Sequence, residues 1–475
     1  HETFLAAIRR VPAGHRLDVS PARQVVRRYW DPTPLDKEID WIREGELDRF
    51  DDLLDNAVAR CYRQGPASVF LSGGLDSISV AAVAADGARR DHYPDPLTLS
   101  LASSSSDVSG SVPDGLSEFL SEAALPEATR RDAAGSEVRE TAPDAVQVAR
   151  ALGLNHEVLR LDDGVGREGV VEEALRLTKG WPTPILNTWL PTYARLAERS
   201  RRHGVSVMMT GRGRNGWLSL SPYFSADLMT RVNVVAWCRF ITSWKRSSEE
   251  SWPQLVRSAF STYGAKPLAS SVMDRVFPAP WRLSRVRREM RQVPRWVAPD
   301  RLFRRELWDR AQQALMPLHP ARGYYLQDLR SSMDQALLSL ELEENYELGR
   351  RLGVKILNPY WDADLVGMLC RTPPHLINRS GRPRKLVLTS VARRFPALAL
   401  GTPTFDRTPS LFRAALATEA DAEWKRLGGV EALADLKIVD PIATAKVFAS
   451  QTTSASSVDR LWDILSAETW ARSHA

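Results

Sequence analysis

Six consecutive residues, Ser72-Gly73-Gly74-Leu75-Asp76-Ser77, follow a short apolar run at 67–71. The paired glycines let the backbone turn sharply, so several N–H groups can converge on one anion. A helix beginning at this turn would add the positive end of its dipole. Ser72 and Ser77 offer hydroxyl donors, and Asp76 offers a carboxylate for Mg²⁺. The hexapeptide therefore predicts a phosphate-binding turn rather than a simple Gly-Gly turn. It is not a Walker-type loop, because the chain contains no G-x-x-x-x-G-K-[ST] sequence.

The elements around this turn are predicted to alternate between strands and helices. A second glycine-bearing loop, Thr210-Gly211-Arg212-Gly213-Arg214-Asn215-Gly216-Trp217, follows another apolar run. Apolar spacing predicts strands at 67–71, 97–101, 156–161 and 205–209, and helices at 46–64, 78–85, 141–152, 168–178 and 189–202. A loop rich in Ser and Gly is expected over 102–136, and the chain from 225 onwards is expected to be mainly helical. This order indicates an α/β fold, a doubly wound parallel sheet with a largely helical C-terminal half.

Composition excludes several classes of protein. The chain has 475 residues with a net charge of +6, and 43% of its residues are hydrophobic. Its three cysteines are far apart and show no CxxC spacing, so neither a disulfide framework nor a zinc site is expected. No apolar stretch is long enough to cross a bilayer, no signal peptide is visible, and we expect a cytoplasmic protein. The Arg-rich segment 275–305 has no nucleic-acid motif around it. A solvated helical face is the favoured interpretation there, and an acidic peptide partner is the alternative.

The first loop and its surroundings (SVFLSGGLDSISVAAVAA) resemble the pyrophosphate loop of the asparagine-synthetase family of ATP pyrophosphatases. The resemblance extends over most of the chain. It includes residues 141–157, residues 357–362 (LNPYWD) and residues 381–388 (GRPRKLVL), where it implies that Lys385 is the catalytic lysine. The resemblance implies binding of ATP and Mg²⁺, adenylation of a carboxylate, and release of AMP and pyrophosphate. It also implies a remnant of a glutaminase-like domain at 1–45, followed by the ATP-pyrophosphatase domain at 46–475.

One branch of the family is more similar than the others. Residues 216–223 (GWLSLSPY) and 226–228 are similar to lasso-peptide cyclases, which activate an Asp or Glu side chain of a precursor peptide. The N-terminal amine of the peptide then closes an isopeptide (macrolactam) ring. The resemblance implies a precursor peptide as substrate, with a leader-peptide-binding protein and a cysteine protease of the same pathway as partners. The chain begins at His1 rather than at a nucleophilic Cys, so we expect no use of glutamine.

The second loop departs from the family pattern. By the resemblance, Asp76 and the residue matched by Asn215 would share Mg²⁺, and the family has acidic residues where this chain has Arg212, Asn215 and Gly216. An amide is a weaker magnesium ligand than a carboxylate. We expect the loop residues Gly211, Arg212, Gly213 and Arg214 to contact pyrophosphate, because a guanidinium pairs well with phosphate oxygens. Two alternatives stay open: an asparagine- or β-lactam-forming synthetase for a small molecule, and an inactive relative that binds a peptide or a partner cyclase.

Three acidic residues, Glu343, Glu344 and Glu347, lie in a predicted helix. The resemblance places this helix near the substrate pocket of the family. Their spacing is also that of an ordinary amphipathic helix, and we favour a solvated acidic face over a role in the site.

Overall fold

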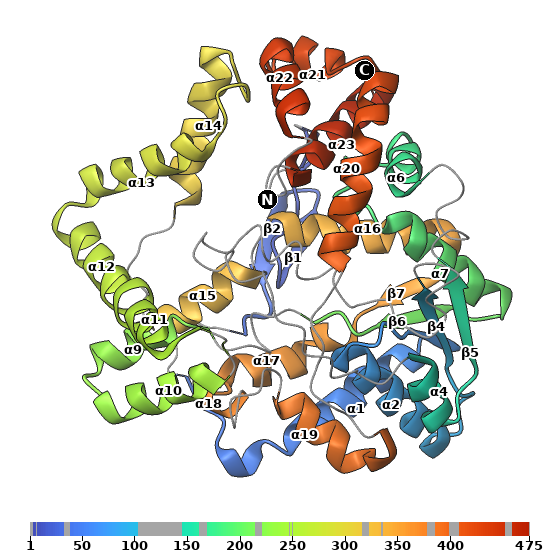
Figure 1. The fold of residues 1–475 in the computed structure, drawn as a ribbon. Helices are drawn as coiled ribbons and strands as arrows, with labels where there is room; N and C mark the ends of the chain where they lie inside the picture. Colours follow the sequence, from blue (N-terminus) through green and yellow to red (C-terminus); the bar gives the residue numbers. More distant parts are fainter. Residues whose placement is uncertain are drawn as a thin grey trace.

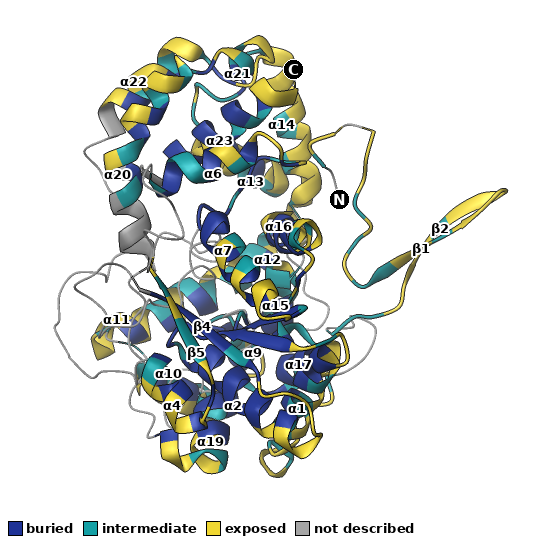
Figure 2. Cartoon of the chain, turned by 90° about the vertical axis from the view of Figure 1, so that its right-hand side faces the viewer, coloured by how far each residue is buried: buried dark blue, intermediate teal, exposed yellow. Residues whose placement is uncertain are grey.

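A computed structural model describes residues 3–5, 7–32, 39–102, 145–160, 169–213, 221–246, 248, 250–315, 323–333, 336–377, 385–398, 408–451 and 458–474. The chain begins with an antiparallel hairpin of β1 (His15–Ser20) and β2 (Arg23–Arg28). The hairpin stands away from the other strands, and most of its residues are exposed (Figure 2). β structure was expected for this segment. Its assignment to a glutaminase-like remnant stays a prediction.

Five parallel strands form the central sheet, in the order β5-β4-β3-β6-β7. They are β3 (Ala67–Phe70), β4 (Leu97–Ala102), β5 (His156–Arg160), β6 (Val207–Thr210) and β7 (Lys355–Leu357). Every residue of β3 and β6 is buried, as expected for strands covered on both faces. Successive side chains along each strand point to opposite faces of the sheet. Val69 packs into one apolar core and Phe70 into another, and Met209 and Met208 divide in the same way.

Helices cover both faces of the sheet (Figure 1). The core on the first face is built from α1 (Arg49–Tyr62), α2 (Leu75–Arg90), α4 (Ala145–Leu152), α15 (Tyr324–Met333), α17 (Ala363–Arg371) and α19 (Lys385–Arg394). The core on the second face is built from α6 (Val170–Thr178), α7 (Leu190–Arg202), α16 (Ala336–Leu352), α20 (Thr408–Leu427), α21 (Glu431–Asp435), α22 (Pro441–Gln451) and α23 (Val458–His474). Short helical segments lie at Glu44–Glu46, Pro359–Trp361, Pro374–Ile377 and Pro396–Leu398.

A third group of helices follows β6. It contains α9 (Phe224–Thr230), α10 (Val234–Arg246), α11 (Trp252–Arg257) and a π-helical segment, Ser258–Ala265. α9, α10, α11 and the π-helical segment share a small apolar core of their own. The chain continues into α12 (Lys266–Val276), α13 (Pro278–Gln292) and α14 (Arg301–Ala314), which lie at the left of Figure 1.

The predicted fold class is confirmed. The four predicted strands exist with ends shifted by at most two residues, and the part after 225 is mainly helical. The exception in that part is β7, which the apolar pattern did not predict. The expected loop over 102–136 lies outside the described residues, apart from residue 102 at the end of β4. Among the residues that the structure describes, no helix is long and apolar enough to cross a membrane.

Candidate functional site

The order of the strands indicates where on the sheet a ligand would bind. From β3 the chain moves outward to β4 and β5, then returns to the other side of β3 to form β6 and β7. The connections therefore change direction between β3 and β6. In open α/β sheets the carboxyl ends of the strands at such a switch point form the ligand-binding crevice. The two loops singled out in the sequence leave β3 and β6 at this edge, so the fold brings them together.

The first loop is a tight turn into α2. Gly73 has a φ of +89°, a conformation that favours glycine, and Gly74 is the extended residue that precedes the first helical turn. Gly74 has no side chain, so the residue at the N-cap position supplies no capping group to this helix. An anion at this end would meet the positive end of a helix dipole. The turn between a buried strand and a helix has the predicted geometry, and its binding of phosphate stays a prediction.

The two serines of the loop hydrogen-bond to one another. The hydroxyl oxygens of Ser72 and Ser77 lie 2.9 Å apart, and the Ser77 hydroxyl donates to the carbonyl of Gly74 at 2.9 Å. The backbone N–H of Ser72 donates to Ser77 Oγ at 3.2 Å. These bonds fix the shape of the turn. The predicted contact of both hydroxyls with phosphate stays a prediction.

The second loop packs directly against the first. A methyl group added at Gly211 would lie 2.2 Å from the backbone nitrogen of Ser77, so the two backbones touch at this point. The hydroxyl of Thr210 donates to Asn358 Oδ1 and accepts the N–H of Arg212 at 3.1 Å. The ends of β6 and β7 are thereby joined beside the turn. The sequence placed Thr210 at the start of the second loop without giving it a role, and it pointed to Asn358 only through the resemblance.

Arg212 is nearly buried, and its guanidinium pairs with the carboxylate of Glu341 on α16. Glu344, one helical turn further on, is also buried, and it accepts backbone N–H groups of Leu186 and Asn187. Burial raises the pKa of Glu344 to about 7, although the two hydrogen bonds and the charge of Arg212 act to lower it. The charged side chains of Arg212, Glu341 and Glu344 are therefore buried beside the second loop and do not face solvent.

The predicted solvated acidic face is thus only partly correct. Glu343 is exposed and pairs with Arg10, as expected for such a face. Glu344 is buried, so the interpretation was wrong for this residue. Glu341, to which no sequence pattern pointed, is buried three residues earlier. The one feature of the sequence that could have pointed to a buried carboxylate such as Glu341 is Arg212, because a buried arginine needs a carboxylate partner.

Asp76 lies in the first turn of α2 and is buried. Among the residues that the structure describes, no three His, Cys, Asp or Glu side chains gather as a protein-held metal would require. Mg²⁺ commonly takes one or two carboxylates and completes its shell with phosphate oxygens and water. Asp76 therefore fits Mg²⁺ that arrives on a nucleotide, but not a metal held by the protein alone. Asn215, the other predicted metal ligand, and Arg214, a predicted pyrophosphate contact, lie outside the described residues.

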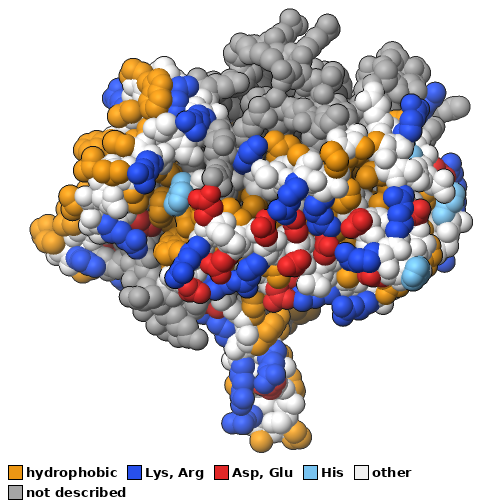
Figure 3. All heavy atoms as spheres, turned by 90° about the horizontal axis from the view of Figure 1, so that it is seen from below, with side chains coloured by type: hydrophobic (Ala, Val, Ile, Leu, Met, Phe, Trp, Pro, Cys, Tyr) orange, Lys and Arg blue, Asp and Glu red, His pale blue; other side chains and the backbone are white. Residues whose placement is uncertain are grey.

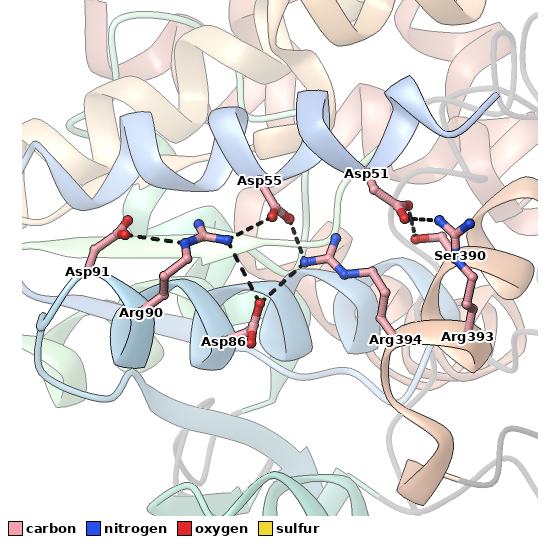
Figure 4. Close-up of polar contacts among 8 residues, drawn as sticks. All are labelled: Asp51, Asp55, Asp86, Arg90, Asp91, Ser390, Arg393 and Arg394. Carbon is pink, nitrogen blue, oxygen red and sulfur yellow. Dashed lines mark hydrogen bonds and ion pairs between the residues drawn. The ribbon is translucent and has the colours of Figure 1, made fainter. Parts of the chain in front are cut away.

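Lys385 is the first residue of α19, a helix that packs on α2. No described contact joins Lys385 to Asp76, so its catalytic role stays a prediction. The opposite end of α19 is tied to α1 and α2 by ion pairs (Figure 4). Arg394 lies 2.7 Å from Asp55 and 3.5 Å from Asp86. Surface ion pairs contribute little individually, but this set links the helix carrying Lys385 to the helix carrying Asp76. The set consists of Asp51, Asp55, Asp86, Arg90, Asp91, Ser390, Arg393 and Arg394.

The face seen from below, where α1, α2 and α19 lie in Figure 1, carries mixed acidic and basic side chains (Figure 3). Cys61 and Cys370 are buried in the core of the first face, and Cys238 is exposed. Burial raises the pKa of each of the two core thiols to about 12, so neither would ionise at neutral pH. None of the three cysteines forms a disulfide, as the sequence predicted.

Comparison with known proteins agrees with this geometry. The family model described as "Asparagine synthase" matches residues 49–472. The match includes both loops, the acidic residues of α16 and Lys385. No curated protein matches the chain.

Proposed function

We propose a function on this premise: the chain belongs to the asparagine synthase family. The family supports an enzyme of the ligase type that forms an amide bond with ATP, generally with Mg²⁺. We propose that this enzyme activates an Asp or Glu side chain of a precursor peptide and closes a macrolactam ring. The main observation in favour of the nucleotide site is the contact between Gly211 and Ser77 at the switch point of the sheet.

The proposed reaction has two steps. A carboxylate oxygen of the peptide attacks the α-phosphorus of ATP, and pyrophosphate leaves. The N-terminal amine of the peptide then attacks the acyl carbon, so that a C–N bond forms, AMP leaves and the amine loses a proton. The net change in the peptide is the loss of one water.

The residues of both loops take roles that suit these steps. The backbone of residues 72–77 would bind the pyrophosphate group, and Asp76 would hold Mg²⁺, which neutralises charge on the phosphates. A guanidinium has five N–H donors, so Arg212 can hold Glu341 and still donate to a phosphate oxygen. Arg214 would add a second fork of donors, beside Asn215 as a weaker metal ligand. Lys385 would stabilise negative charge on the adenylate or on the tetrahedral intermediate.

A peptide is favoured over a small molecule by the likeness of residues 216–223 and 226–228 to lasso-peptide cyclases. The same likeness suggests that a leader-peptide-binding protein and a cysteine protease work with the enzyme. The reaction consumes ATP, which suits the cytoplasm, where free thiols also stay reduced.

Calorimetry with ATP and Mg²⁺ tests the nucleotide site. We expect binding by the native chain and roughly tenfold to hundredfold weaker binding by Asp76→Ala, since charge-assisted contacts contribute about 1.5–3 kcal/mol. Asp52→Ala is the matched control, because Asp52 is an exposed residue of α1. Equal binding by Asp76→Ala and the control would remove Asp76 from the site.

Mass spectrometry tests the peptide reaction. A precursor peptide incubated with ATP and its processing partners should lose one water without added glutamine. Dependence on glutamine or ammonia would assign the chain to the small-molecule synthetases. If only Asn215→Asp combined with Gly216→Glu creates turnover, the natural chain is an inactive relative.

A further inference from the structure

The surface of α12 and α13 carries an exposed apolar run that the proposed reaction does not use. Five consecutive residues at the junction of these helices, 276–280 (VFPAP), are all exposed, with exposed fractions of 59% for Val276 and 52% for Phe277. Runs of this length on a surface are unfavourable unless they serve a function. We call residues 276–280 the elbow.

The elbow is held in a defined position. Asp274, at the end of α12, is buried, and Arg282 on α13 approaches its carboxylate at 3.7 Å. Ser271 on α12 is hydrogen-bonded to the hydroxyl of Tyr324 on α15 at 2.6 Å. These two contacts hold the junction between α12 and α13 in place. Its apolar side chains are presented on an ordered support, which lowers the entropy cost of binding.

Basic side chains continue from the elbow along α13. Leu283, Arg287 and Arg291 follow one another at intervals of four residues, so they form one row on the helix. All three are exposed, and Val286 and Met290, on the adjoining side of the helix, are buried. The row extends about 12 Å, a little more than two helical turns. A partner on this face would meet apolar side chains at one end and guanidinium groups along the rest.

The positive charge of the whole chain is concentrated in this region. Residues 266–314 contain 12 Lys and Arg and 5 Asp and Glu, a net charge of +7, whereas the whole chain has +6. The remainder therefore has a net charge of −1. In Figure 3, hydrophobic and basic side chains lie side by side at the left, where α11–α13 lie in Figure 1. A positive field of this kind attracts and orients an acidic partner.

We infer that the elbow and the row Leu283–Arg287–Arg291 dock an acidic segment of a separate polypeptide that carries apolar side chains at one end. A nucleic acid is the less suitable partner, because it would leave the aliphatic groups of Val276 and Leu283 unused. The inference does not depend on the proposed ATP chemistry.

Fluorescence anisotropy with a designed peptide tests this surface. The probe is a peptide of about 15 residues with Glu and Asp along its length and Leu and Phe at one end. Two matched peptides replace either the acidic residues by Gln and Asn or the apolar residues by Ser. We expect the full-length chain to bind the probe at least roughly tenfold more tightly than either matched peptide, and more weakly as salt is added.

Two double variants locate the binding surface. Arg287→Glu with Arg291→Glu, and Val276→Ser with Phe277→Ser, should each weaken binding of the probe at least roughly tenfold. The matched controls are Arg201→Glu with Arg202→Glu on α7, and Ile442→Ser, whose side chain is exposed on α22. These controls should bind the probe like the native chain. Circular dichroism and ATP binding should be unchanged in all variants, which separates this test from the test of the nucleotide site.

Other outcomes would overturn the inference. They are no binding of the probe, equal binding of the Ser-substituted peptide, and equal effects of the control variants. Tighter binding of a DNA duplex or of vesicles containing anionic lipid would assign the surface to another class of partner. A dimer in sedimentation that Val276→Ser with Phe277→Ser abolishes would assign the elbow to a second copy of the chain.

Discussion

Replacement of Gly211 by Ala tests whether the two loops form one site. The added methyl group would lie 2.2 Å from the backbone nitrogen of Ser77, 2.5 Å from its Cα and 2.7 Å from the carbonyl carbon of Asp76. All three are backbone atoms, so no side-chain rotation can relieve the overlap. The second loop must move away from the first turn of α2, or that turn must itself be displaced.

The size of this displacement sets the expected effect on binding. Ordinary contact of a methyl group begins at 3.4 Å, so the backbones must separate by about 1.2 Å. A hydrogen bond weakens steeply when its geometry is disturbed to this extent. Loss of one charge-assisted bond to a phosphate oxygen costs about 1.5–3 kcal/mol, which is roughly one to two decades in the dissociation constant. In a reaction, a misplacement of about 1 Å can reduce the rate about a hundredfold.

Calorimetry with ATP and Mg²⁺ measures the effect, and a thermal melt confirms that the variant is folded. Gly367→Ala is the matched control, because a methyl group at this position on α17 would meet no atom within 4 Å. The control should bind ATP like the native chain. If Gly211→Ala binds ATP with native affinity, the two loops do not act together on the nucleotide, and the site at the switch point is refuted.

Three further predictions concern charged residues of the second loop and α16. Glu344 has a folded pKa of about 7, above its usual 4.5, so its contribution to stability is complete below pH 4.5 and is lost as the pH rises through 7. Denaturant unfolding at several pH values should show this loss, about 3 kcal/mol in all, and Glu344→Gln should remove it. Glu341→Ala leaves Arg212 charged without its carboxylate and should lower the free energy of unfolding by about 3–5 kcal/mol. Combined replacement by Glu341→Leu and Arg212→Met should lower it much less. Arg214→Ala should slow the ring-closing reaction roughly tenfold to a hundredfold, and an unchanged rate would exclude Arg214 from the pyrophosphate contact.

Much of the fold could be predicted because its main strands are short apolar runs that end at glycine turns. β3 and β6 are of this kind, and their burial on both faces makes them uniformly apolar. β7 could not be predicted in the same way. It has three residues and begins with Lys355, whose ammonium group donates to Gln64 at 2.7 Å. Pairing with β6 makes it a strand, and local sequence carries little of that information.

The start of α2 shows a second limit of sequence patterns. The apolar pattern predicted a helix from residue 78, but the helix begins at Leu75. Asp76 and Ser77 are polar residues that are buried in the first turn of the helix, and Gly211 of the second loop lies against their backbone. Helical periodicity assigns buried positions to apolar residues, so it misses a first turn that faces another loop.

The charge at position 212 bears on whether the second loop has merely decayed. A buried guanidinium without a partner lowers the stability of the folded state by several kcal/mol. A loop that had changed without constraint would leave the guanidinium unpaired. In this chain the side chain of Arg212 is 10% exposed and that of Glu341 is 4% exposed, and the two are paired. The arginine at the end of β6 is thus matched by a carboxylate from α16, a helix more than a hundred residues later in the chain. This match supports a loop whose altered charge is part of a built site, and it makes Arg212 and Glu341 a unit that must be changed together.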